Sequence, residues 1–394
     1  MRQTNDQRAA VPPALPQGAA PEEYMRQLVL HVGSIKTGST SAQTTFAASR
    51  ERLAAHGVHY ASISRNHGAV SRVIRATRRN GFPGEADLAG VRAQEASDFT
   101  LMERAAAEAA AVKSGTYMFS SEALLTHSAR NVALLKSIVD RLFPDFAVSV
   151  LVYIRHPLSY TISRGQNEIK LGTDTTALIE ERGYDGELRV GVERYAEVFG
   201  RDAMIVRSYD AVIADGRSVQ EDMLEAIGHP GAAEGLVIER SNESISMNAA
   251  LVADIVNPAL AERGIRVDAN VRRAKKQLLS EIAGPRFAFS RAALDAVRGP
   301  CRTEAAWFAE AYGLALSEPK VVVREDIADK LMPADEIADH ADRVLERISA
   351  VRQAVAKRKA KKARGRKPRR EQKKEPDPSG NFFAKLIKRF RFSR

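Results

Sequence analysis

The chain has 394 residues, of which 44% are hydrophobic, enough to bury the core of a folded protein. Its single cysteine, Cys301, excludes an internal disulfide framework and fits a reducing compartment. The formal net charge of +11 is uneven, because residues 357–394 hold 17 Lys/Arg against 3 Asp/Glu and so carry +14. Residues 1–356 therefore sum to about −3, and the basic character belongs to the tail.

The first 25 residues are rich in Ala, Pro and Gln and lack the apolar segment of a signal peptide, so we expect a disordered leader. No apolar run of 18 residues occurs in the sequence, so we expect no transmembrane helix.

The stretch from Gln27 to Phe46 reads QLVLHVGSIKTGSTSAQTTF. It predicts a short buried strand, a glycine-containing loop and the first turn of a helix. Loop N–H groups and a helix N-terminus together form an anion site, and Lys36 adds a full positive charge. The alternative is an ordinary strand–turn–helix corner with a solvated lysine.

The order of residues in this loop is not that of a nucleoside-triphosphate loop, G-x-x-x-x-G-K-[ST]. Gly33 and Gly38 have that spacing, but the lysine precedes Gly38 instead of following it. The run instead resembles the 5′-phosphosulfate loop of sulfotransferases that depend on 3′-phosphoadenosine 5′-phosphosulfate (PAPS). That resemblance implies that five residues bind this end of PAPS: Lys36, Thr37, Gly38, Ser39 and Thr40.

Strand and helix patterns then alternate along the chain. We expect the first helix to reach His56, a strand over 58–64, and helical stretches over 72–79 and 95–112. A third strand, 115–121, ends in Ser120-Ser121-Glu122, which would open a helix over 123–142.

A second motif follows a fourth strand pattern, Ala147 to Arg155. Pro157 suits the first position of a helix over 158–171, and Ser163 lies eight residues after Arg155. Sulfotransferases carry such an Arg and Ser to hold the 3′-phosphate of PAPS, and a guanidinium offers a fork of donors to phosphate oxygens. The alternative is a strand-end arginine in a surface ion pair and a serine facing water.

With a fifth strand over 202–210, the alternation predicts an α/β fold with a parallel sheet flanked by helices. Ligands of such sheets bind at the carboxyl ends of the strands, where Lys36, Glu122 and Arg155 fall. The resemblance to the bacterial branch of the sulfotransferases covers about residues 26–315, so we expect one domain over 26–318 with a P-loop-like sulfotransferase fold.

The resemblance implies in-line transfer of a sulfuryl group to a hydroxyl or amine, with adenosine 3′,5′-bisphosphate (PAP) as product. Lys36 would neutralise charge on the leaving phosphate. A general base must take the acceptor proton. Glu122 lies where the cytosolic sulfotransferases have a catalytic histidine, although it could equally cap a helix start; His67 is the other candidate. We see no metal-ligand cluster and expect no metal.

After the domain, residues 333–358 predict a helix with apolar residues at spacings of four and three. This pattern fits a coiled coil, and hence a homodimer, or one helix that packs back on the domain. The apolar positions are Ile337, Ala341, Val344, Ile348, Val351 and Val355.

The chain ends with a polybasic linker, 357–380, and a basic segment, 381–394, whose Phe382, Phe383 and Phe390 share one helical face. A basic amphipathic helix with aromatic residues is typical of binding to an anionic membrane surface. The clustered phenylalanines favour lipid over nucleic acid, while an anionic glycan or a solvated tail stay open.

The sequence therefore predicts a cytoplasmic PAPS-dependent sulfotransferase, peripheral at the inner face of a membrane. Its acceptor would be a carbohydrate, a lipid-linked glycan or a lipid. The alternatives are a P-loop kinase or another nucleotide-dependent transferase, and a membrane-tethered relative without catalysis.

Overall fold

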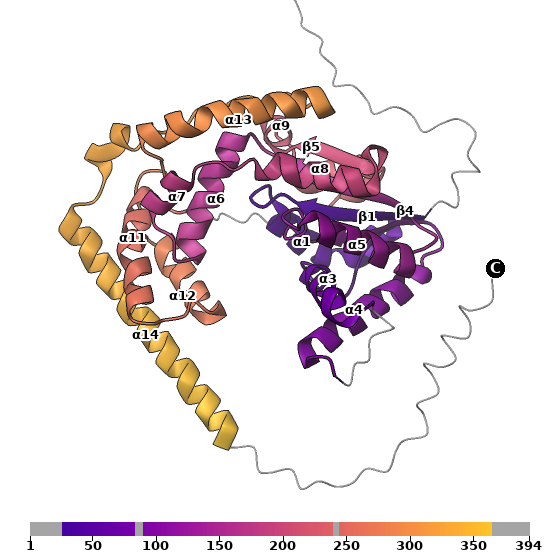
Figure 1. Cartoon of the computed structure of the whole chain (residues 1–394), viewed down its shortest axis with the longest axis horizontal. Helices are drawn as coiled ribbons and strands as arrows, with labels where there is room; N and C mark the ends of the chain where they lie inside the picture. Colours follow the sequence, from indigo (N-terminus) through magenta and orange to yellow (C-terminus); the bar gives the residue numbers. More distant parts are fainter. Residues whose placement is uncertain (1–25, 83–89, 239–243, 365–394) are drawn as a thin grey trace, which may run out of the picture.

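The structure is a computed structural model that describes residues 26–82, 90–238 and 244–364 (Figure 1). Its five-stranded sheet has the order β2-β3-β1-β4-β5, and every pair of neighbours is parallel. This arrangement confirms the predicted α/β class with a parallel sheet. The strands are β1 Arg26–Gly33, β2 Val58–Tyr60, β3 Gly115–Ser120, β4 Ala147–Ile154 and β5 Met204–Ser208.

The helices form two groups. Those around the sheet are α1 Ser39–Ala48, α2 Arg50–Ala55, α3 Gly68–Asn80, α4 Ala93–Ala110, α5 Ala129–Leu142, α8 Glu187–Phe199, α9 Tyr209–Ala214 and α10 Val219–Ala226. The others are α6 Pro157–Leu171, α7 Thr176–Arg182, α11 Met247–Glu262, α12 Ala269–Ser280, α13 Arg291–Tyr312 and α14 Ala334–Arg364. Short 3₁₀ helices are η2 Arg201–Ala203, η3 Pro230–Ala233 and η4 Glu325–Lys330.

Alternate side chains of the central strands fill two cores, one on each face of the sheet. Leu28, Leu30 and Val32 of β1 face the core formed with α3, α4, α5 and α8. Val29 faces the core formed with α1, α2, α9 and α10. Because both faces are covered, the strands read as nearly continuous apolar runs, which is why they could be predicted from sequence.

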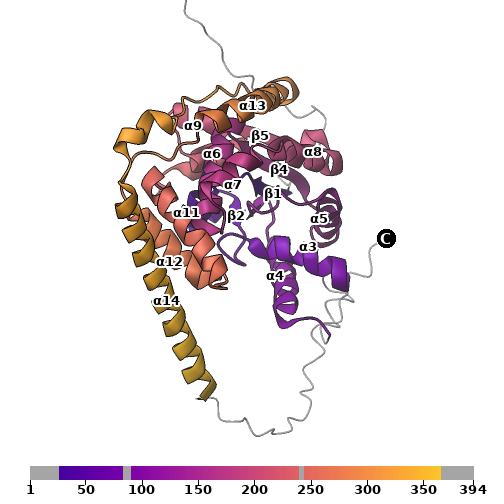
Figure 2. The same ribbon diagram turned by 60° about the vertical axis from the view of Figure 1, so that its left-hand side comes forward.

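A third core holds together a helical lobe, made of α6, α7, α11, α12, the first part of α13 and α14. Figures 1 and 2 show this lobe beside the sheet, with α6 between the two. The helix α13 belongs to both parts, since Cys301 packs in the lobe and Phe308 in a sheet core. The lobe therefore faces the carboxyl edge of the sheet through α6, which leaves directly from β4.

Four of the six apolar positions predicted for α14 pack within the chain. Ile337, Ala341, Val344 and Ile348 are buried in the core of the helical lobe, and α14 packs along α11 and α12. Figures 1 and 2 show its last turns extending beyond those two helices. This helix therefore packs on the helical lobe of its own chain.

Several boundaries differ from the sequence prediction; the fifth strand, for example, spans residues 204–208 rather than 202–210. The first helix is interrupted at Ser49, and β2 ends at Tyr60 rather than continuing to residue 64. The helix expected from residue 123 begins at Ala129, with Ser128 as its N-cap. Ser121 and Glu122 therefore lie in a turn, because their segment bonds back to β1: the Ser121 N–H donates to the His31 carbonyl over 2.9 Å.

The predicted leader, most of the polybasic linker and the amphipathic segment lie outside the described residues. Within the described residues, no helix has both the length and the apolarity needed to cross a bilayer.

Candidate functional site

The loop between β1 and α1 is fixed by its own hydroxyl groups. The Thr37 and Ser39 hydroxyls both donate to the carbonyl oxygen of Ser34, over 2.7 and 3.1 Å. The Ser34 hydroxyl in turn donates to the Tyr153 carbonyl of β4 over 3.0 Å. The loop is therefore tied both to itself and to the neighbouring strand.

Two loop residues adopt left-handed backbone conformations. Lys36 has a φ of 66° and Gly38, the N-cap of α1, has a φ of 79°. A Cβ atom on Gly38 would meet the Val219 side chain at 3.1 Å, so the glycine is needed for both its conformation and its space. A lysine in this region is uncommon, and such residues concentrate at functional sites.

Arg155 lies directly beyond the end of β4, close to the loop. Its guanidinium donates to the Lys36 carbonyl over 3.4 Å and lies 5.3 Å above the centre of the Tyr209 ring. The nearest carboxylate oxygen, on Asp210, is 3.7 Å away. The Nε–H of Arg155 is buried and has no hydrogen-bond acceptor among the described residues. Arg155 therefore forms a long ion pair with Asp210 and also contacts the loop.

The helix α6 carries a row of cavity residues at spacings of four: Ser163, Asn167 and Leu171. Pro157 occupies its first turn, as predicted, and His156 is its N-cap. The Leu158 N–H donates to the His156 ring over 3.1 Å, so this histidine serves as a helix cap.

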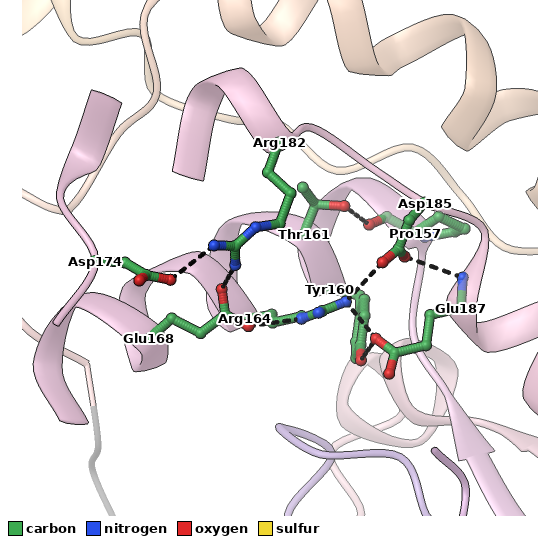
Figure 3. Close-up of polar contacts among 9 residues, drawn as sticks. All are labelled: Pro157, Tyr160, Thr161, Arg164, Glu168, Asp174, Arg182, Asp185 and Glu187. Atoms are coloured by element: carbon green, nitrogen blue, oxygen red, sulfur yellow. Dashed lines mark hydrogen bonds and ion pairs between the residues drawn. The ribbon is translucent and has the colours of Figure 1, made fainter. Parts of the chain in front are cut away.

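The neighbouring side of α6 is held by the ion-pair network drawn in Figure 3. Arg164 pairs with Glu168 on its own helix and with Asp185 and Glu187 at the start of α8. Arg182 of α7 pairs with Glu168 and Asp174. Because these arginines and carboxylates are linked in one network, they fix the rotation of α6 better than isolated ion pairs would. Ser163, next to Arg164, is thereby kept on the cavity side.

These elements surround a cavity of about 430 Å³, within the range of small-molecule sites. It brings together seven of the nine residues proposed from sequence: Lys36, Gly38, Ser39, Thr40, Glu122, Arg155 and Ser163. Its remaining lining residues are Ile35, Ser41, Asn167, Leu171, Tyr209, Ser244 and Lys276.

Glu122 and Arg155 lie on opposite sides of the loop. In the sheet, β1 is flanked by β3, which precedes Glu122, and by β4, which precedes Arg155. The strands β3 and β4 are therefore two strand spacings apart, about 10 Å, and Glu122 and Arg155 follow strands separated by that distance. Glu122 is half-buried, and its turn packs on the loop: a Cβ atom on Gly33 would lie 3.2 Å from the Glu122 carbonyl. Since α5 begins at Ala129, Glu122 does not cap a helix.

Thr37 and His67 are not among the residues that line this cavity. Thr37 is fully buried and stabilises the loop through Ser34. His67 is fully buried, and its Nδ1 accepts from the Ser120 N–H over 2.8 Å. Its Nε2 then carries the proton and donates to the Ala61 carbonyl over 2.9 Å. Both ring nitrogens of His67 are therefore bonded to backbone groups, and its side chain does not face the cavity.

A second cavity of about 370 Å³ adjoins the first and shares Arg155, Ser163 and Ser244 with it. It adds two more cationic residues, Arg286 and Lys320. Within the described residues, no group of three or more His, Cys, Asp and Glu side chains is arranged to hold a metal ion.

Sequence reasoning missed the contributions of the helical lobe. Asn167 and Leu171 could have been found from their spacing after Ser163, since i, i+4 and i+8 share one helical face. Lys276 had no such signal, because it reaches the cavity from α12, about 100 residues further along the chain. Ser244 lies just before α11 and was not predicted as a site residue.

The burial of His67 predicts a pH dependence of stability. Burial lowers the pKa of His67 from 6.5 to about 4, so below pH 6.5 the unfolded chain binds a proton that the folded chain does not. The free energy of unfolding should therefore fall as the pH drops from 6.5 towards 4, by up to about 1.4 kcal/mol per pH unit for this group. In urea titrations across this range, His67→Gln should show a shallower fall than the wild type. Equal slopes would contradict the buried neutral imidazole.

No family model matches the chain. No curated protein matches it either. Among solved structures, a sulfotransferase from Alicyclobacillus acidocaldarius is similar over 63% of this chain and 99% of its own, with 18% identity and a TM-score of 0.32. At that identity and TM-score the match does not bear on activity, so a function has to be argued from the site.

Proposed function

We propose that the chain is a PAPS-dependent sulfotransferase that moves a sulfuryl group to a hydroxyl or amine of a carbohydrate, lipid-linked glycan or lipid. The observation that carries this proposal is the cavity shared by the two phosphate motifs. The Lys36 loop and the Arg155–Ser163 pair lie 119 residues or more apart in sequence, yet they line one space. A ligand with two separate anionic groups fits such a site.

The two ends of the cavity suit different anions. At one end, the first turn of α1 offers backbone N–H groups that have no partner within the helix, together with the Lys36 ammonium. At the other, the buried Nε–H of Arg155 has no acceptor in the part of the chain that the structure describes, and Arg286 and Lys320 line the adjoining cavity. We assign the first end to the 5′-phosphosulfate and the second to the 3′-phosphate of PAPS.

The transfer would follow from this placement. The acceptor oxygen or nitrogen attacks sulfur as the bond from sulfur to the 5′-phosphate oxygen breaks, and the electron pair of that bond stays with the phosphate. Lys36 and the loop N–H groups stabilise the charge that develops on this oxygen. The acceptor loses its proton to Glu122, which faces the cavity from the β3 side of the loop.

The donor site can be tested by calorimetric titration with adenosine 3′,5′-bisphosphate, using ATP–Mg²⁺ as the comparator. We expect micromolar binding of the bisphosphate, weakened at least about tenfold in Lys36→Ala and in Arg155→Ala, because each substitution removes a charged donor to phosphate. Lys113→Ala is the matched control. This exposed lysine precedes β3 and so lies at the amino ends of the strands, whereas the cavity lies at their carboxyl ends. A clear preference for ATP–Mg²⁺ would favour the kinase alternative, and failure to bind the bisphosphate would reject the proposal.

The role of Glu122 can be tested by the rate of PAP release from PAPS with water as acceptor. Glu122→Gln keeps the size of the side chain but removes its basicity, so the rate should fall about 10²- to 10⁴-fold. His67→Gln should retain most of the rate, because His67 lies outside the cavity lining. A normal rate in Glu122→Gln, or a comparable loss in His67→Gln, would show that the base is misassigned.

We also propose that the basic tail, which lies outside the described residues, binds an anionic membrane surface. If residues 381–394 form a helix, their phenylalanines share one face, so they and the polybasic linker would supply the apolar and electrostatic parts of such binding. The full chain should co-sediment with vesicles that contain phosphatidylglycerol and much less with pure phosphatidylcholine. A chain without residues 381–394 should bind more weakly, and equal binding of the two proteins would contradict this role.

A further inference from the structure

The cavity continues along α6 past the part that the proposed donor occupies. Ser163, Asn167 and Leu171 form one row of lining residues. That row is about 12 Å long, because eight residues of helix rise about 1.5 Å each. The donor would contact the Ser163 end of this row, next to Arg155. The Leu171 end is therefore left to the second substrate.

The Leu171 end is closed by α12, which a buried lysine anchors there. Lys275 is fully buried, and its ammonium donates to the carbonyl oxygens of Ile169 and Gly172 and to Oδ1 of Asn257. These bonds attach α12 to the last turn of α6. Burial lowers the pKa of Lys275 to about 7, because desolvation disfavours the charged ammonium.

The next residue, Lys276, points elsewhere. Consecutive residues on an α-helix point about 100° apart, so the side chain of Lys276 points away from the buried contact that Lys275 makes with α6. Lys276 is half-buried and lines the main cavity together with Leu171 and Glu122. It also interacts within the chain, so a bound anion would join or replace that contact. In the proposed reaction Lys36 and Arg155 serve the donor and Glu122 takes the proton, which leaves Lys276 without a role.

We propose that Lys276 determines acceptor specificity by binding an anionic group of the acceptor, so that the substrate class is a hydroxyl compound carrying a carboxylate, phosphate or sulfate. This inference rests on the proposed function. An ammonium beside the acceptor end forms charge-assisted hydrogen bonds to such groups and offers nothing comparable to a neutral compound. The anchored α12 fixes the backbone of Lys276, so the discrimination would be built into the fold of the helical lobe.

The test is calorimetry on the full chain saturated with adenosine 3′,5′-bisphosphate. Three probes share one scaffold: phenyl β-D-glucuronide, phenyl β-D-glucoside 6-phosphate and the neutral phenyl β-D-glucoside. In the wild type, we expect at least one anionic probe to bind about tenfold tighter than the neutral one, and the two anionic probes distinguish a carboxylate from a phosphate preference. Lys276→Met should abolish this difference in affinity, and Lys276→Arg should restore most of it. Arg273→Ala, which removes an exposed charge from the same helix, should leave the difference unchanged.

The outcomes separate the two proposals. A wild type that fails to bind the bisphosphate rejects the proposed function and this inference with it. If the bisphosphate binds, three results overturn the inference alone: no measurable binding of the anionic probes, equal binding of all three probes, or a preference that survives Lys276→Met. A loss of bisphosphate affinity in Lys276→Met equal to that in Lys36→Ala would also overturn it, because the lysine would then serve the donor.

Discussion

The carbonyl oxygen of Ser34 is the point on which the candidate site depends. Two hydroxyls of the loop donate to it, from Thr37 and Ser39, while the hydroxyl of Ser34 itself is bound to β4. These bonds hold the loop backbone in place before any ligand arrives, so its N–H groups need little reorganisation to meet an anion. Such preorganisation is what electrostatic stabilisation of a leaving group requires.

The helix α6 connects the Lys36 loop to the helical lobe at the site. It starts directly after Arg155, presents Ser163, Asn167 and Leu171 to the cavity, and is fixed on its neighbouring side by the Arg164 network. Its last turn receives the Lys275 ammonium, which brings the helical lobe against the cavity. One element thus sets the distance between the proposed donor end and the proposed acceptor end, and changes in the lobe would alter acceptor preference without touching the phosphate loop.

The parts of the site that could be predicted from sequence are those encoded locally. Strand, loop and helix N-terminus follow one another at Lys36, as do strand, proline and helix at Arg155, and parallel strands bring both to one edge. The role of His67 could not be read this way, because its burial depends on Ser120 and Ala61, which fold around it. The turn at Glu122 is likewise set by bonds to β1, and Lys276 reaches the cavity only through the packing of α12 on α6. Local pattern carries no information about such long-range contacts.

The most direct test of this account is a crystal structure of the chain with adenosine 3′,5′-bisphosphate. We expect the 5′-phosphate at the N-terminus of α1, in contact with Lys36 and the loop N–H groups, and the 3′-phosphate on Arg155 and Ser163. We also expect open space from the 5′-phosphate towards Glu122 and Lys276. A bisphosphate bound outside this cavity, or bound with its two phosphates exchanged, would contradict the assignment of donor and acceptor ends.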